Sequence, residues 1–181
     1  MTIDELRERF PDHAKDIRLN LGSVTGITTL TEQQLYGTML SSALASRDAE
    51  VVAAVAADAI PRMSHAAVEA ARSAASLMAM NNVYYRFLHQ IEDPQYASMP
   101  VKLRMQALGA PGVDKIDFEL WCIAVSAING CASCVKAHER KVIQAGASRE
   151  MVQDVVRIAS VVHAAALTVE GERSLAAAGL A

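Results

Sequence analysis

Three side chains that can carry redox or acid–base chemistry lie within eight positions of the chain. Cys131 and Cys134 are three residues apart, and His138 follows four residues after the second thiol. Residues three, four and seven apart share one face of a helix, so both thiols and the imidazole are expected along one stripe. An imidazole beside a thiol can take its proton or, once charged, stabilise the thiolate. Cysteines at this spacing can also form a disulfide with little backbone movement.

Four kinds of site fit such a pair: a metal site, a structural disulfide, a redox pair and simple core packing. A zinc site needs about four ligands, whereas Cys131, Cys134 and His138 supply three and the chain has no second CxxC and no HxxxH. Core packing suits Cys122, which lies in the apolar run LWCIAVSAI, because a free cysteine packs as a small apolar residue. A thioredoxin-type CxxC follows a strand in a βαβ unit, and no such strand is predicted here. A redox pair on a helical scaffold is therefore the favoured interpretation.

Two patterns disagree on which thiol is the more reactive. Asn129 is a good N-cap candidate, which would place Cys131 in the first turn of the next helix. The macrodipole and the unpaired N–H groups favour thiolate there. The position of His138, four residues after Cys134, favours Cys134 instead. The residues by themselves leave the question open.

The elements that must position these groups read as helices throughout. The 181 residues suit one domain with a sizeable core, and they are 52% hydrophobic but only 4% aromatic. Alanine-rich sequence of this kind favours close-packed helices, so we predict an all-α compact bundle over residues 1–181. Thr2 and Glu5 form a predicted capping box, and Gly146 a predicted helix stop. Period, length and caps predict helices over 32–46, 50–60, 115–128, 131–146 and 149–171, and a short one at 101–108. The stretch 65–91 is long enough to be one helix or two.

Several classes of function find no support. The net charge of −3 and the absence of a basic block argue against a nucleic-acid partner. The charged N-terminus is unlike a signal peptide, and no 18 apolar residues run together, so we expect a cytoplasmic protein with no membrane partner. In a reducing compartment a close cysteine pair is more often catalytic or metal-binding than structural. Without a Gly-rich dinucleotide fingerprint, no bound nicotinamide or flavin is expected.

A faint internal repeat has an offset of 85 positions, which matches Tyr36 with Trp121 and Arg72 with Arg157. It indicates a duplication with halves at about 30–90 and 115–175; the alternative is that alanine-rich helices align with each other by chance.

The segment FELWCIAVSAINGCASCVKAHE resembles the active-site segment of the AhpD family of alkyl hydroperoxide reductases, in the carboxymuconolactone decarboxylase-like superfamily. A glutamate, a tryptophan and then Asn-Gly-Cys-x-x-Cys-x-x-x-His are far more specific than CxxC alone. AKDIRLNL and MAMNNVYYRF are similar to other characteristic stretches of the family, so the likeness covers nearly the whole chain. The resemblance implies an all-helical fold with an internal duplication, assembled as a homotrimer.

The resemblance also implies the roles of four residues. Cys134 is the peroxide-reactive thiol that passes through a sulfenic acid, and Cys131 is its disulfide partner and proton donor. Glu119 and His138 form a proton relay, although spacing alone does not bring them together across Gly130. Many family members carry a second histidine just before the second cysteine, where this chain has Ser133.

The implied function is a thiol-dependent antioxidant enzyme. It would reduce organic hydroperoxides, regenerate a peroxiredoxin (AhpC), or do both, without a bound cofactor or metal. Its electrons would come from dihydrolipoyl groups on lipoyl domains of a 2-oxoacid dehydrogenase complex, recharged by dihydrolipoamide dehydrogenase. We expect Lys136, Arg140 and Lys141 to present positive charge to an acidic lipoyl domain. The alternatives are a decarboxylase of the same superfamily, which needs no CxxC, and a non-enzymatic helical binding subunit whose thiols only pack.

Overall fold

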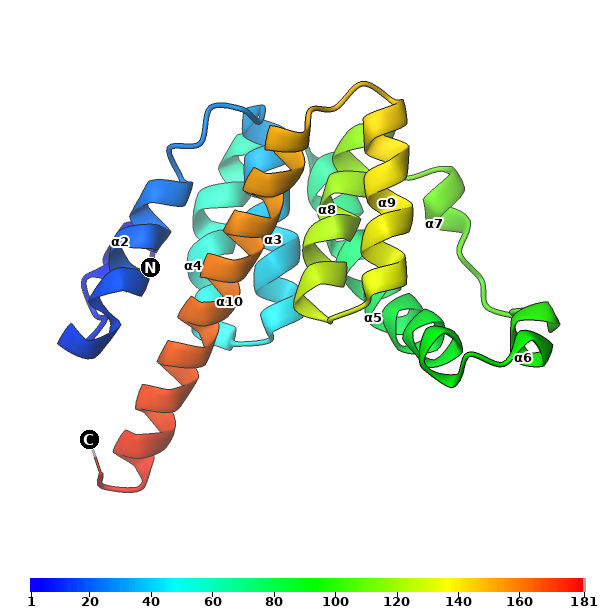
Figure 1. Cartoon of the computed structure of the whole chain (residues 1–181). Helices are drawn as coiled ribbons and strands as arrows, with labels where there is room; N and C mark the ends of the chain where they lie inside the picture. Colours follow the sequence, from blue (N-terminus) through cyan, green and yellow to red (C-terminus); the bar gives the residue numbers. More distant parts are fainter. Residues whose placement is uncertain (181) are drawn as a thin grey trace.

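The computed structural model describes residues 1–180, and within them every regular element is a helix (Figure 1). The predicted all-α fold is therefore confirmed. The α-helices are α1 (Ile3–Arg7), α2 (Lys15–Val24), α3 (Glu32–Ser46), α4 (Ala49–Ala59), α5 (His65–Ile91), α6 (Pro94–Ser98), α7 (Gln106–Gly109), α8 (Lys115–Ile128), α9 (Ala132–Gln144) and α10 (Arg149–Ala177), with 3₁₀ turns at Asp12–Ala14 and Ile60–Arg62.

Most predicted helix bounds agree with the structure. α3, α5 and α8 have the bounds that period and caps predicted, and α10 continues six residues beyond its prediction. The capping box of Thr2 and Glu5 is present, with both of its hydrogen bonds. The short helix predicted at 101–108 is wrong in extent, because α7 begins only at Gln106 and Lys102 has a left-handed φ of 52°. The helices α2 and α6 were not predicted.

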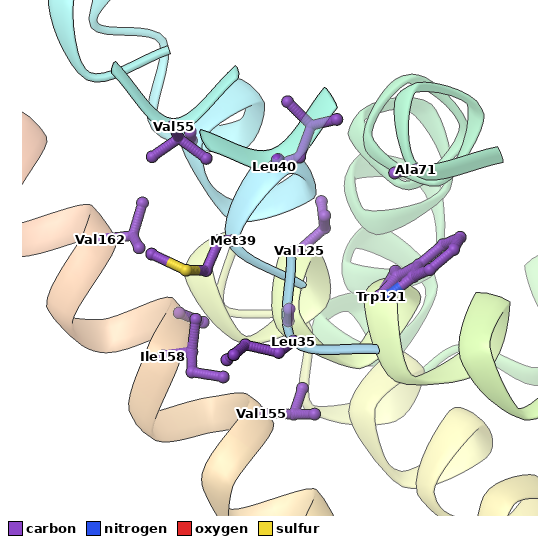
Figure 2. Close-up of a cluster of buried hydrophobic side chains, with 14 of the residues drawn as sticks. Leu35, Met39, Leu40, Val55, Ala71, Trp121, Val125, Val155, Ile158 and Val162 are labelled. Carbon is purple, nitrogen blue, oxygen red and sulfur yellow. The ribbon is translucent and has the colours of Figure 1, made fainter. Parts of the chain in front are cut away.

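The core lies where α3 packs against α4, α5, α8 and α10, with α8 also against α5, α9 and α10. Figure 2 shows its centre, to which α3 contributes Met39, α8 contributes Val125 and α10 contributes Ile158. By length and composition, α10 is the one helix within residues 1–180 that could cross a membrane. Its residues Ile158 and Val162 are fully buried in this core.

A close approach between α3 and α8 fixes the rotation of α8. A Cβ atom on Gly37 would lie 2.2 Å from the indole of Trp121, so only glycine leaves room for that ring. The Trp121 indole N–H donates to the carbonyl of Gln34 at 3.3 Å. Glu119 precedes Trp121 by two residues, about 200° around the helix. Packing of Trp121 on α3 therefore turns the Glu119 side chain away from α3.

Two sets of helices follow the same order along the chain. α3, α4 and α5 lie in the first predicted half, and α8, α9 and α10 in the second. The two long helices have 27 and 29 residues, and each begins at a serine N-cap, Ser64 and Ser148. The duplication itself stays a prediction. The end of α5 and the short helices α6 and α7 extend away from the other helices on one side (Figure 1).

Candidate active site

The reversal between α8 and α9 brings the candidate residues together. Gly130 has a left-handed φ of 67°, its N–H donates to the carbonyl of Ala127 at 3.1 Å, and the N–H of Cys131 donates to that of Ser126 at 3.0 Å. These two bonds define a Schellman motif, which ends a helix most readily with glycine at this position. The chain reverses within three residues, so α9 packs against α8 (Figure 1).

The predicted N-cap at Asn129 is wrong. Asn129 is the C-cap of α8, because its N–H completes the ladder of that helix by donating to Val125 at 3.0 Å. The N-cap of α9 is Cys131, and Cys134 is the third residue of the helix. Both cysteines thus lie at the start of α9, so the helix terminus does not favour one thiol over the other as the more reactive. The position of His138, one turn beyond Cys134, still favours Cys134.

Cys131 and Cys134 form a disulfide, with their Cα atoms 5.3 Å apart. Both residues are buried, with 1% and 6% of their surface exposed, and His138 is buried as well. The hydroxyl of Ser133, which stands at the position of the family's second histidine, lies 3.5 Å from the Cys131 sulfur. Cys131 and Cys134 are therefore covalently joined, and large reagents cannot reach their sulfur atoms.

The Glu119 carboxylate faces α9 and is shared by an imidazole and an ammonium group. One oxygen pairs with Nδ1 of His138, and the other accepts a hydrogen bond from Nζ of Lys141 at 2.7 Å. Burial by itself raises the pKa of Glu119, but the hydrogen bonds and charges of His138 and Lys141 outweigh it and lower the pKa below its ordinary value. Glu119 is thus a buried, ionised partner of His138 rather than a solvated charge.

The third cysteine has a different environment. Cys122 is a free thiol, fully buried on α8. Burial raises the pKa of this thiol far above its ordinary value, and the neighbouring Glu119 carboxylate adds to the rise. The prediction that Cys122 is a core residue is confirmed, and its thiol is unsuited to nucleophilic chemistry.

A buried polar network beneath the turn was missed by the sequence reasoning. Asn82 of α5 donates to Oγ of Ser126 at 2.9 Å and accepts from the Asn129 amide at 3.0 Å. Arg86, one turn further along α5, donates to the Asn129 carbonyl at 2.6 Å. The signal was available, since both residues lie in the stretch MAMNNVYYRF, where polar side chains four apart interrupt an apolar helix face.

The contact of Lys141 with Glu119 was also missed. Lys141 follows His138 by three residues, which puts the two side chains on one face of α9, but the prediction used Lys141 only as surface charge. Lys136 and Arg140 are exposed as expected. Within residues 1–180, no group of three or more His, Cys, Asp or Glu side chains is arranged to hold a metal ion.

Comparison with known proteins finds relatives over nearly the whole chain. The carboxymuconolactone decarboxylase family matches residues 94–178. A protein of Frankia alni named alkyl hydroperoxide reductase AhpD is 55% identical over 170 residues, which is 94% of this chain and 92% of that protein. A protein of the same name from Rhodopseudomonas palustris is 52% identical over 179 residues, or 98% of this chain and 99% of that one.

The chain belongs to the AhpD family of alkyl hydroperoxide reductases. A third relative of that name, from Methylocella silvestris, is 53% identical over 170 residues and covers 94% of this chain and 96% of its own length. Membership confirms the family resemblance and places the chain among alkyl hydroperoxide reductase-type oxidoreductases. The roles of Glu119, Cys131, Cys134 and His138 stay predictions, which their placement around one turn makes testable.

Proposed function

We propose that the chain is a thiol-dependent antioxidant enzyme that reduces organic hydroperoxides with its CxxC dithiol, regenerates the peroxiredoxin AhpC, or does both. The observation that carries this proposal is the pairing of a buried disulfide with a buried acid–base couple. Cys131 and Cys134 are joined one helical turn from His138, and His138 is paired with Glu119. A purely structural disulfide has no need of an ionised glutamate and an imidazole beside it.

The proposed reaction begins from the dithiol. The Cys134 thiol gives its proton to His138, and the thiolate attacks the hydroperoxide oxygen, which yields Cys134 sulfenic acid and, with that proton, the alcohol. The Cys131 thiol then displaces water from the sulfenic acid, forms the disulfide and supplies the remaining proton. The substrate gains two electrons, and the cysteine pair loses two.

The relay of this chain contains one histidine. Ser133 can hydrogen-bond the Cys131 sulfur, but a hydroxyl does not titrate near neutral pH. His138 is therefore the base for the thiol proton, and Glu119 stabilises the imidazolium that forms. We expect the loss of His138 to be uncompensated.

Reduction of the disulfide requires an outside dithiol, which we propose is a dihydrolipoyl group. A dithiol attacks one sulfur, passes through a mixed disulfide and leaves as a disulfide, so two electrons return to the cysteine pair. The buried pair suits a reductant on a long, narrow lysyl arm better than a thiol fixed on a protein face. We propose that a lipoyl domain of a 2-oxoacid dehydrogenase complex docks on the exposed side chains of Lys136 and Arg140 and is recharged by dihydrolipoamide dehydrogenase.

We propose a homotrimer located in the cytoplasm. Apolar side chains four residues apart are exposed on the end of α5, at Val83, Phe87 and Ile91, and the exposed ring of Tyr96 on α6 packs against Phe87. Leu167 on α10 is exposed as well. So much apolar surface is typical of self-association. Light scattering at micromolar concentration that gives the monomer mass of 19.4 kDa would contradict the trimer.

A thiol titration separates the proposed enzyme from its rivals. The reduced chain is treated with one equivalent of cumene hydroperoxide, and free thiols are counted before and after in the denatured protein. We expect the loss of two thiols and the survival of Cys122. A decarboxylase or a binding subunit whose thiols only pack would lose none. In Cys131→Ser, we expect Cys134 to stop at the sulfenic acid, which dimedone traps.

A further inference from the structure

The Glu119 carboxylate has two oxygens, and the proposed relay uses only the one that faces His138. The other accepts a hydrogen bond from Lys141 Nζ at 2.7 Å. Lys141 lies three residues after His138 on α9, so the ammonium and the imidazole reach Glu119 from one face of the same helix. The Lys141 side chain is half exposed, at 50%, whereas that of Glu119 is 10% exposed. The lysine ammonium thus lies between the buried carboxylate and solvent.

A pocket of about 350 Å³ opens between α8 and the end of α9 beside this contact. Glu119 and Lys141 line it, together with Lys115 and Ala145. Neither His138 nor the disulfide lines it, so water in this pocket reaches the carboxylate without passing the sulfur atoms. The pocket is large enough to hold several water molecules or a small amine.

We propose that Lys141 is a positioning residue of the Glu119–His138 relay and that this pocket is the opening of the relay to solvent. The inference rests on the relay proposed above. Before a hydroperoxide reacts, the Cys134 thiol shares one proton with His138, and bulk pH sets this ionisation only if the relay exchanges protons with water. The buried cysteine pair provides no route for that exchange. Lys141 holds the outer oxygen of Glu119 at the pocket and keeps the carboxylate ionised.

No other cation contacts Glu119 within residues 1–180. The titratable neighbours of Glu119 on α8 are Cys122, Asp117 and Lys115. Cys122 stays a neutral thiol, and Asp117 accepts hydrogen bonds from two glutamines of α3 at 2.7 Å. Lys115 lines the same pocket one turn before Glu119, but it is exposed and forms no ion pair with the carboxylate among residues 1–180. The charged groups of the other packed helices have their own partners: Arg86 of α5 on the Asn129 carbonyl, and Asp154 of α10 with Arg157 and Thr29. Among residues 1–180, Lys141 is thus the one lysine or arginine that bonds the Glu119 carboxylate.

The test measures the alkylation rate of Cys134 by iodoacetamide against pH in the reduced chain, followed on the Cys134 peptide by mass spectrometry. It needs neither hydroperoxide nor an electron donor. Without the Lys141 ammonium, the negative charge of Glu119 is no longer balanced on its outer side. The surroundings of His138 and Cys134 become more negative, which disfavours the thiolate. In Lys141→Ala the pH of half-maximal rate should therefore rise by about half a unit, the size expected for a half-exposed ion pair. Lys141→Arg should keep the wild-type curve, as should Lys15→Ala, which removes an exposed lysine of α2.

Ethylammonium added to Lys141→Ala tests the pocket. This small cation can replace the missing ammonium beside Glu119, so millimolar concentrations should move the curve back toward that of the wild-type protein. A purely structural role of Lys141 would give no such rescue, and a shift that ethylammonium leaves uncorrected overturns the part assigned to the pocket.

His138→Phe distinguishes failure of this inference from failure of the relay. If His138→Phe changes the curve and Lys141→Ala leaves it where it was, the role of Lys141 is overturned and the relay stands. If neither variant changes it, the relay itself is wrong.

Discussion

Replacing Asn82 with alanine tests whether α5 holds the turn that carries the disulfide. The buried Asn82 side chain bonds both Ser126 and Asn129, at 2.9 and 3.0 Å. Asn82→Ala removes both hydrogen bonds and leaves two polar groups without this partner. A neutral hydrogen bond contributes about 1 kcal/mol, and a buried polar group left unpaired costs about 1–3 kcal/mol. We therefore expect the free energy of unfolding to fall by about 2–4 kcal/mol.

Asn81 supplies a matched control. It is the neighbouring residue on α5, it is equally buried, and its Oδ1 has no hydrogen-bond partner among residues 1–180. Asn81→Ala loses packing but leaves the turn intact, so its free energy of unfolding should fall by about 1 kcal/mol or less. Urea unfolding of the oxidised protein at pH 7 measures both values, provided that the m-value is unchanged. Equal destabilisation of the two variants would refute this account of the network.

The same pair of variants tests the link to function. Cys131 directly follows the Asn129–Gly130 turn and has only 1% of its surface exposed, so dithiothreitol must await local opening of the turn. Asn82→Ala should speed reduction of the disulfide, and Asn81→Ala should not. A reduction rate unchanged in a destabilised Asn82→Ala protein would show that the network stabilises the fold without controlling access to the disulfide.

Four further predictions concern the site itself. Cys134→Ser should abolish hydroperoxide consumption in a coupled assay, because a serine hydroxyl is not ionised at neutral pH; full activity would disprove its assigned role. His138→Phe should lower the rate of hydroperoxide reduction near neutral pH, and lower it less at high pH, where the thiol ionises unaided. Stopped-flow rates across pH measure this, and an unchanged pH profile would exclude the relay. Because the pKa of Glu119 is lowered by folding, its carboxylate stabilises the protein above the unfolded-state value of about 4.3, and this contribution is lost as pH falls through the lower, folded value. Urea unfolding from pH 6 to pH 3 should therefore show a smaller loss of stability in Glu119→Gln than in the wild-type protein, and parallel curves would contradict this. Lys136→Glu combined with Arg140→Glu should slow turnover with a lipoylated domain and weaken its salt dependence, while turnover with free lipoamide stays the same; an unchanged salt dependence would exclude the docking patch.

Much of the fold could be predicted because its helices are regular and have strong end signals. The bounds of α5, for example, follow from Ser64 as N-cap and from an apolar period sustained to Ile91. Where the backbone leaves regular geometry, prediction failed. Val101, Met105 and Leu108 are spaced as on one helix face, yet Lys102 takes a left-handed φ and the helix begins only at Gln106.

The candidate site could be predicted as a set of residues but not as a geometry. The stripe of Cys134 and His138 follows from helical spacing, since both lie on α9. The pairing of Glu119 with His138 depends on how α8 packs against α9, and no spacing rule spans the Gly130 turn. Asn129 was assigned to the wrong helix because an asparagine before a helix fits an N-cap and an asparagine before a glycine fits a C-cap. The two Schellman hydrogen bonds after Asn129 show that it is the C-cap of α8.

In the predicted register of 85, the two halves of the chain differ at every position that carries the proposed chemistry. Glu119 corresponds to Gln34, Cys131 to Ser46 and Cys134 to Ala49. Gln34 forms the capping box of α3 with Thr31 and donates to Asp117 at 2.7 Å, so it serves the contact between α3 and α8 rather than a relay. Ser46 donates to the carbonyl of Ser42 within α3. The first half therefore packs against α8 and holds it in place. The carboxylate of the proposed relay lies on α8, and the imidazole and the two thiols lie on α9 or at its N-cap. Each chain then has one redox site, on the half whose helix reversal contains the cysteines.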